Sequence, residues 1–429
     1  MAELEEIPLY RLGFVARKVG LTPDTIRAWE RRYGLPQPRR TGGGHRLYSG
    51  RDVATLQWLK ARMNEGMSIG QAVGLWRQLV VQGVDPLREP GPFRPEHPDL
   101  LRTAWVQACL AYDEEGADAV ISRALALYDI ETVLEQVLRP GLRQVGDLWY
   151  RNEATVEQEH FASQVASRRL YALLSQQPPG IRRQVVLLGT PEGELHDLPV
   201  LFLAVFLRRR GYRTLLLGAQ LPGQPPGHLQ PAVAVLSCQW LGPVPALQRL
   251  AARLLEAGIR VAFLGRVFRI HPRLAEQVPG FLLPDDLARA VSGVDALLEA
   301  APPEPELPRT APWVCRAAGA LEAVAPRLNS YLTERLGAAG AEAVQVVAVA
   351  AQALSIIRAA VLLGDLDLLD PELEWVGGML ATRGLDPGLV GSFCLVLSEG
   401  LARLAPDDAK PLATWLAQRA EVWAGGAGR

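Results

Sequence analysis

Arginine side chains gather in two short stretches near the start of the sequence. In the first stretch, Thr22–Tyr33, Arg27 and Arg31 stand at i, i+4, so a helix would present both on one face. Arg32 adds a third positive charge. Arginine can reach both DNA phosphates and the edge of guanine in the major groove. These residue types at this spacing predict a helix that reads DNA.

The second basic stretch surrounds a glycine turn at residues 42–44. Side chains that can bind phosphate flank this turn, and they are Arg39, Arg40, His45, Arg46 and Tyr48. A turn of this kind between short strands is typical of a wing that grips the phosphates beside a recognition helix. Thr22 is predicted to cap the recognition helix and to lie among the DNA contacts, with a proline at the first helical position.

Neighbouring segments must position these side chains. Leu12–Lys18 is predicted as a first helix, with Gly20 as the turn that leads into the recognition helix. Trp29 and Tyr33 share a neighbouring face and are expected to anchor that helix to a core. Residues 7–80 therefore read as one compact winged helix-turn-helix unit.

The two basic stretches resemble the MerR family of winged-helix regulators over about residues 8–78. The matching sequences are Ile-Arg-Ala-Trp-Glu-Arg-Arg-Tyr-Gly-Leu-Pro and Arg-Arg-Thr-Gly-Gly-Gly-His-Arg-Leu-Tyr-Ser. The resemblance implies that a dimer binds a pseudo-palindromic, double-stranded promoter. Metal-sensing members dimerise through a long helix directly after this unit, but the linker 81–98 contains Pro86, Pro90, Pro92 and Pro95. A homo-oligomer, dimer or tetramer, should therefore form through later domains.

Length and composition set the remaining limits. The 429 residues are sufficient for about three domains. The net charge of −1 excludes a chain that binds nucleic acid through overall charge, and the four cysteines form no CxxC pair. The acidic start and the short, interrupted apolar runs predict a cytoplasmic protein without a membrane segment.

The middle of the chain combines two kinds of pattern. Residues 99–178 carry apolar side chains at three- and four-residue spacings, which predict a bundle of about four helices. Residues 182–300 alternate short apolar strands with helices, as in a doubly wound, Rossmann-like parallel sheet. In such a sheet, ligands bind at the carboxyl ends of the strands.

A histidine stands at that edge, directly after the first strand of the predicted sheet. His196 is flanked by Glu194 and Asp197, either of which could hold one ring nitrogen while the other binds a metal. A second group, Trp149, Glu159 and His160, comes where the helical segment turns into its last helix. Taken singly, His196 and the Glu159–His160 pair are each better explained as ordinary surface residues.

Together the two groups resemble the cobalamin-binding module of light-sensing MerR regulators, over about residues 100–300. The resemblance implies that His196 is the lower axial ligand of cobalt, with Glu194 and Asp197 beside it. Trp149, Glu159 and His160 would cover the upper face, against the adenosyl group of adenosylcobalamin. The nucleotide tail would approach Ser237 and Gly265.

Four features depart from that pattern. Pro199 replaces a usual glycine, Arg266 follows Gly265 where a second glycine is usual, and the segment 220–231 is short and rich in proline. Tyr150 occupies a position where the photosensing relatives often place a histidine. The alternative that stays open is a cofactor-free sensor domain that serves oligomerisation or protein partners.

Residues 309–425 return to helical periodicity after a second proline-rich linker. We expect a dimerisation domain, with its tryptophans in the core and at the rim. A short fragment around Trp375 also resembles the helical, globin-like extension of photocobilins, which bind a bilin. By that likeness biliverdin is a second cofactor to consider, with Arg358 and Arg383 as partners of its propionates and Cys315 or Cys394 as a tether.

The sequence as a whole predicts a transcriptional regulator, a repressor rather than an activator. Its oligomeric state would be controlled by a cobalamin bound between the helical bundle and the sheet, with light as a candidate signal. Beyond these residues the sequence offers no catalytic constellation, so we do not expect an enzyme.

Overall fold

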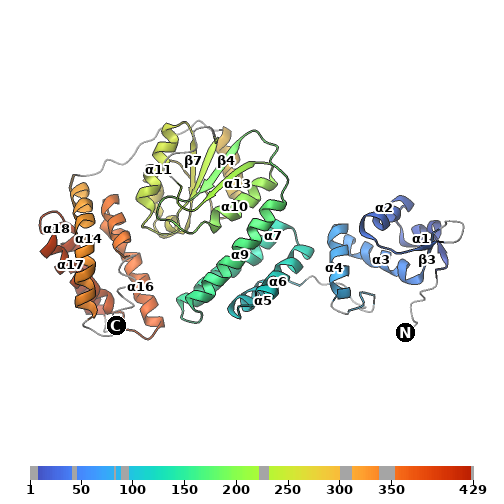
Figure 1. Cartoon of the computed structure of the whole chain (residues 1–429), viewed down its shortest axis with the longest axis horizontal. Helices are drawn as coiled ribbons and strands as arrows, with labels where there is room; N and C mark the ends of the chain where they lie inside the picture. Colours follow the sequence, from blue (N-terminus) through green and yellow to red (C-terminus); the bar gives the residue numbers. More distant parts are fainter. Residues whose placement is uncertain are drawn as a thin grey trace. The chain divides into compact units, whose positions relative to one another are not determined.

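The computed structural model describes residues 8–40, 46–81, 84–87, 96–221, 231–299, 312–337 and 353–426. They form a mostly helical protein with one parallel α/β sheet, as the sequence predicts (Figure 1). The chain divides into two compact units, residues 1–145 and 146–429. The boundary falls inside the predicted helical segment 99–178. None of the helices in the described ranges has the length and apolar character needed to cross a membrane.

The first unit opens with a small three-stranded antiparallel sheet in the order β1-β3-β2. Its elements are β1 (Tyr10–Arg11), α1 (Leu12–Val19), α2 (Pro23–Tyr33), β2 (Arg39–Arg40), β3 (Arg46–Tyr48), α3 (Gly50–Asn64) and α4 (Ile69–Val81). Gly20, with φ +68°, makes the left-handed turn between α1 and α2. The ammonium group of Lys60 on α3 donates to the Val19 carbonyl at the end of α1, at 2.8 Å. The predicted helix–turn–helix order is confirmed.

Four further segments complete the helical part around the unit boundary. They are α5 (Pro98–Leu110), α6 (Glu114–Leu127), α7 with the π-helix η1 (Ile130–Val133 and Leu134–Leu138) and α8 (Arg139–Tyr150). In the first unit, α5 packs on α6 and on η1, around a fully buried Trp105. Gly141 permits the contact of α8 with the Trp105 ring, because a Cβ there would come 2.7 Å from that ring. The linker prediction for 81–98 falls largely outside the described residues.

The second unit contains the parallel sheet, whose order is β5-β4-β6-β7-β8. The strands are β4 (Val185–Gly189), β5 (Arg213–Gly218), β6 (Val233–Ser237), β7 (Arg260–Leu264) and β8 (Phe281–Leu282). The predicted alternation of short apolar strands with helices is confirmed, and the apolar runs of β4, β6 and β7 are buried. The last strand, β8, has only two residues.

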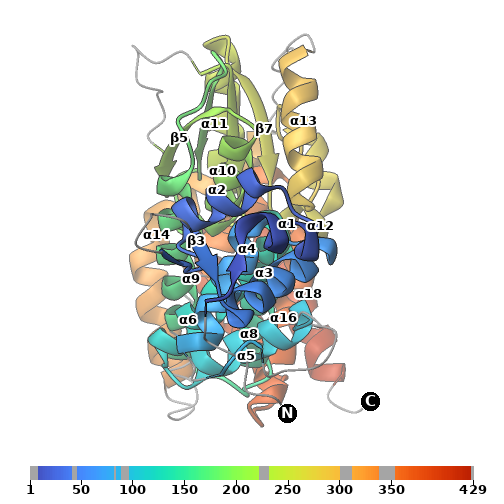
Figure 2. The same ribbon diagram turned by 90° about the vertical axis from the view of Figure 1, so that its right-hand side faces the viewer.

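Helices cover this sheet. They are α9 (Val156–Gln176), α10 (Leu198–Arg209), α11 (Val244–Glu256), the short α12 (Arg266–Ile270) with η2 (Pro272–Glu276), and α13 (Leu287–Glu299). α10 contacts α9 and α13, and α13 also contacts β6 and β7 (Figures 1 and 2). Figure 1 shows α11 on the other side of the strands. The connections between parallel strands place the loops after β4, β6 and β7 at one edge.

The described C-terminal residues are helical, as predicted. The segments are α14 (Pro312–Gly337), a helix at residues 353–363, η3 (Leu366–Leu369), α16 (Asp370–Thr382), α17 (Leu389–Leu404) and α18 (Lys410–Gly426). One continuous hydrophobic core joins these helices to the parallel sheet, with Phe263, Leu328 and Leu397 among its members. The C-terminal helices are therefore part of the same folded unit as the sheet.

Candidate functional site

The predicted recognition helix is α2, and local capping fixes where it begins and ends. The Thr22 hydroxyl accepts a hydrogen bond from the Thr25 N–H at 3.1 Å, so Thr22 acts as the N-cap. Arg27, Arg31 and Arg32 are exposed on this helix. Trp29 is only 6% exposed, which confirms its anchoring role. The arginines thus project from a helix that the core holds in place.

An ion pair joins the recognition helix to the strand that follows the glycine turn. Nε of Arg46 in β3 donates to both carboxylate oxygens of Glu30 in α2, at 2.8 and 3.1 Å. Both side chains are at most 30% exposed. Arg39 and Arg40 are exposed in β2, which pairs with β3. Arg46 therefore fixes the strands against α2, and Arg39 and Arg40 remain available to a ligand.

The prediction that Tyr48 contacts phosphate is wrong, and His45 lies outside the described residues. The sequence placed Tyr48 among the phosphate contacts, but its side chain is 0% exposed in the core beside Ile26 and Trp29. Among the residues that the structure describes, its hydroxyl has no hydrogen-bond partner. Burial raises the pKa of Tyr48 to about 12. Nothing in the sequence of this basic stretch indicated that the side chain of Tyr48 faces the core.

At the edge of the parallel sheet, a buried carboxylate orients His196. Glu194 is 0% exposed, and its Oε1 lies 2.6 Å from Nδ1 of His196. The same oxygen accepts from the His196 backbone N–H at 2.9 Å. This hydrogen bond to Glu194 raises the pKa of His196. The side chain of His196 is 66% exposed, so the ring extends outward from its anchor.

Glu194 itself is held by the loop after β6. Its Oε2 accepts from the Gln239 backbone N–H at 2.6 Å, and the Gln239 side chain donates to the buried Ser237 hydroxyl at 2.7 Å. Gln239 also accepts from the Arg266 N–H at 3.3 Å. Gln239 thus links three loops of the sheet edge, a role that no sequence signal indicated.

Gly265 and Pro199 both have local structural reasons. Gly265 adopts φ +146°, and a Cβ there would overlap the Cys238 carbonyl oxygen, so the loops after β6 and β7 require glycine at this point. Pro199 lies in the first turn of α10, where a missing N–H costs no helical hydrogen bond. Arg266 is exposed at the start of α12. The proline-rich segment 220–231 lies mostly outside the described residues.

Asp197 lies beside His196 at the N-cap of α10. Burial raises the pKa of its carboxyl group, and Tyr171 on α9 partly opposes that shift. No signal in the sequence pointed to Tyr171. α9 packs against α10, the helix that follows the loop carrying His196.

The first turns of α9 carry the second predicted group. Glu159 accepts a hydrogen bond from Ser163 at 2.9 Å, and its charge contributes to the raised pKa of His196, so the two residues lie within electrostatic reach. The His160 side chain is 72% exposed, with Nε2 at 3.8 Å from Glu159. Trp149 is half-buried at the end of α8. Glu159 and His160 thus lie on the first turns of α9, and Trp149 lies at the end of α8, before the turn that joins the two helices.

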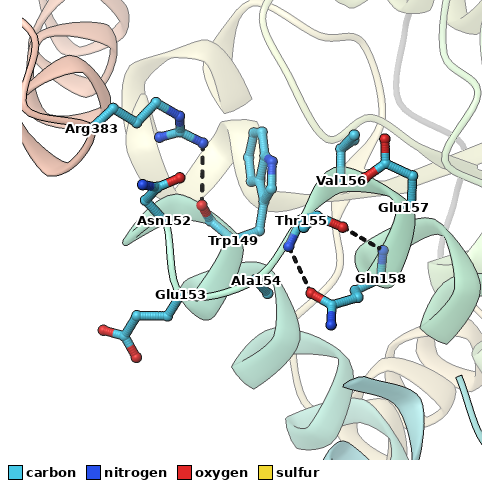
Figure 3. A pocket seen from close by; sticks show the side chains of 9 residues that line it. All are labelled: Trp149, Asn152, Glu153, Ala154, Thr155, Val156, Glu157, Gln158 and Arg383. Atoms are coloured by element: carbon cyan, nitrogen blue, oxygen red, sulfur yellow. Dashed lines mark hydrogen bonds between the residues drawn. The ribbon is translucent and has the colours of Figure 1, made fainter. Parts of the chain in front are cut away.

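A cavity of about 380 Å³ opens where α8 turns into α9 (Figure 3). Trp149 forms part of its wall, together with residues 152–158 and Arg383 from the C-terminal helices. The Thr155 hydroxyl caps α9 by accepting from the Gln158 N–H at 3.3 Å, and the Gln158 side chain bonds back to Thr155. This capping box gives the turn beside the cavity a fixed conformation.

The donor set suits a metal that is already held by a macrocycle. Within the described ranges, no group of three or more histidine, cysteine or acidic side chains is placed to hold a metal ion. His196 instead offers a single imidazole, oriented from behind by a buried carboxylate. One oriented nitrogen from the protein is sufficient when the cofactor itself supplies the remaining ligands of the cobalt. These residues therefore fit a corrinoid.

The side chains considered for a bilin have other surroundings. Arg358 pairs with Glu322 at 2.8 Å, and Arg383 donates to backbone carbonyls of Trp149, Tyr150 and Met379. Cys394 is 0% exposed, and burial raises the pKa of its thiol to about 12. Cys315 is exposed on α14.

Two parts of the chain match known protein families. Residues 10–79 match the MerR HTH family of regulatory proteins, and residues 101–174 match the B12 binding domain. The chain is 35% identical over 285 residues to the HTH-type transcriptional repressor CarH of Myxococcus xanthus, covering 63% of this chain and 93% of CarH. It is 33% identical over 218 residues to the repressor CarA of the same organism, covering 49% and 69%. The solved monomethylamine corrinoid protein of Methanosarcina barkeri aligns with a TM-score of 0.41 at 16% identity, covering 46% of this chain and 98% of that protein.

Proposed function

The chain belongs to the B12-binding MerR-type transcriptional regulators that include CarH and CarA, and from this membership we propose that it is a cobalamin-controlled repressor. Residues 7–80 form its winged helix-turn-helix DNA-binding domain, which takes double-stranded promoter DNA in the cytoplasm. Residues 99–178 and 182–300 form the helical and Rossmann-like halves of the sensor. Residues 309–425 supply a helical domain, and the protein acts as a regulator rather than an enzyme.

The observation that carries this proposal is the His196–Glu194 pair at the carboxyl edge of the parallel sheet. It provides one oriented metal ligand where such sheets bind cofactors. Glu159, on the first turn of α9, contributes to the raised pKa of His196. Asp197 borders the loop that carries His196, and Ser237 and Gly265 lie where the nucleotide tail of the cofactor would approach.

Adenosylcobalamin, when bound, would supply a light-sensitive cobalt–carbon bond. The protein's own contribution is to hold its ligand histidine from one side and to place Trp149, Glu159 and His160 on the other. Loss of the adenosyl group would change what those three residues contact. The equilibrium between oligomeric states would then shift. Because linked DNA-binding domains bind paired half-sites together, a change in oligomeric state changes their avidity for the promoter.

The test is reconstitution of the full chain in the dark with adenosylcobalamin. We expect a red protein whose absorbance spectrum changes on illumination, together with a change in oligomer size and in binding to its promoter. His196→Ala should alter the spectrum and weaken uptake, whereas His97→Ala, an exposed histidine at the start of α5, should not. A wild-type protein that stays colourless after exposure to cobalamins would exclude the sensor and favour a cofactor-free scaffold.

A further inference from the structure

The end of α8 is held by side chains from the C-terminal helices. Arg383, just after α16, donates to the carbonyls of Trp149 and Tyr150, each at 3.3 Å. The Thr382 hydroxyl donates to the Tyr150 carbonyl at 2.9 Å. The last carbonyls of a helix have no partner within the helix, and a cation at that end is favourable. The Trp149 carbonyl also accepts from the Asn152 N–H at 3.0 Å, so the C-terminal helices add to a local cap at the end of α8.

Aromatic packing reinforces this contact. The ring of Trp375 in α16 lies 6.0 Å from the ring of Trp149 and 5.6 Å from that of Tyr150. The Tyr150 hydroxyl donates to the Trp375 carbonyl at 3.4 Å. Gly378 permits this approach, since a Cβ there would overlap the Tyr150 hydroxyl. Tyr150 is therefore used for docking, at a position where a histidine could have served as a ligand.

Arg383 also faces the cavity beside Trp149. Its guanidinium carbon lies 5.7 Å from the centre of the Trp149 ring, a distance typical of a cation–π contact. Figure 3 shows Arg383 reaching the Trp149 carbonyl from a separate helix, across the cavity from the first turn of α9. The cavity's volume, about 380 Å³, lies within the range of about 300–1,000 Å³ found for small-molecule pockets. The C-terminal helices thus contribute the Arg383 side chain to the lining of this cavity.

We infer that Arg383 is a positioning residue of the sensor, which sets Trp149 at the cavity wall so that docking of the C-terminal helices and occupancy of the cavity are coupled. The occupant is the organic group on the upper face of a bound corrinoid. The inference rests on the proposed function and extends it, because it makes the C-terminal helices part of the ligand pocket. Coupling is reciprocal, so what fills the cavity also changes how firmly α16 is held.

The first test compares upper-ligand selectivity in Arg383→Ala, Arg383→Lys and the wild type. Arg383→Ala should lower affinity for adenosylcobalamin by about tenfold, within the usual range of coupling between sites, and affect hydroxocobalamin less. Arg383→Lys should restore affinity in part, because it keeps the charge but not the forked donors. The matched control is Arg335→Ala, which breaks an exposed ion pair with Glu399 within the C-terminal helices. Thermal melting should show that all variants fold.

The second test measures hydrogen exchange of residues 146–158 and 370–383 in the full chain. Adenosylcobalamin should slow exchange in both segments more than hydroxocobalamin does, and Arg383→Ala should remove that difference. A wild type that binds adenosylcobalamin with a selectivity unchanged in Arg383→Ala overturns this inference and leaves the proposed function intact. A wild type that binds no corrinoid overturns both. Faster exchange in both segments of ligand-free Arg383→Ala would then show that the contact serves stability alone.

Discussion

Nδ1 of His196 lies 2.6 Å from the carboxylate of Glu194, and Glu194 is 0% exposed. The same carboxylate accepts two backbone N–H groups, from His196 and from Gln239. Three hydrogen bonds therefore fix the carboxylate, and the carboxylate fixes the ring. The imidazole is oriented before any metal arrives, so little of the binding energy is lost in ordering it.

Replacing that carboxylate should weaken corrinoid binding while the ligand itself remains. Glu194→Gln removes the negative charge behind His196, and loss of such a partner typically costs about 10- to 100-fold in metal affinity. Spectrophotometric titration of the apoprotein would measure the change. Glu192→Gln, an exposed residue of the same loop, is the control and should bind normally. Equal affinities in Glu194→Gln and the wild type would show that Glu194 only shapes the loop.

The exposed arginines of α2 and β2 should contribute through phosphate or base contacts. Arg31→Ala and Arg39→Ala should each weaken DNA binding, and a lost phosphate contact should reduce the salt slope of the binding constant by about one. Binding would be measured on promoter fragments at several salt concentrations. Arg403→Ala, on the exposed side of α17, should leave both affinity and slope unchanged. An unaltered slope in both α2 and β2 variants would remove these residues from the interface.

For the Glu30–Arg46 pair we expect an effect on DNA affinity opposite to the one that charge alone would predict. An acidic residue on a DNA-reading helix repels phosphate, so its removal alone would strengthen binding. Here Glu30 holds β3 against α2 through Arg46, and we expect Glu30→Ala to weaken binding. A double-mutant cycle with Arg46→Ala should give a coupling of about 1 kcal/mol in the free energy of unfolding. Tighter DNA binding by Glu30→Ala would refute the positioning role.

Tyr48 should contribute to the stability of the core, and this contribution should change at high pH. Because its folded pKa is raised from 10.0 to about 12, the fold favours the protonated phenol. The stability that this provides is fully present below pH 10 and is lost as the pH rises toward 12. Tyr48→Phe should lessen this alkaline loss in the free energy of unfolding. It should also raise stability at neutral pH by about 1 kcal/mol, because the buried hydroxyl has no partner within the described part of the chain. DNA affinity should not change, whereas a marked loss would return Tyr48 to the interface.

The four cysteines should differ in reactivity. Burial raises the pKa of Cys109 and of Cys394 to about 12 and that of Cys238 well above its usual range. Cys315 is the exposed thiol. A thiol reagent at pH 8 should therefore modify one cysteine per native chain, and Cys315→Ser should abolish the reaction. Rapid modification of a second cysteine would indicate local opening of a core.

Much of the architecture follows from local patterns in the sequence. The N-cap Thr22 and the glycines at 20 and 34 fix α2, because capping and left-handed backbone depend on adjacent residues. The apolar runs of β4, β6 and β7 predicted buried parallel strands for the same reason. The sequence also determined that a histidine with acidic neighbours follows the first strand of the sheet.

Only the tertiary structure decided which side chains meet across distant segments. Side chains alternate between the two faces of a strand, and the pairing register decides which of them face the core. The register of β3 with β1 and β2 turns Tyr48 inward. Gln239 reaches Glu194 because parallel strands place their ends at one edge. Arg383 meets Trp149 across 234 positions of sequence, and no local pattern can specify a contact of that separation. Packing of the C-terminal helices on a shared core, rather than the chemistry of either residue, brings those two together.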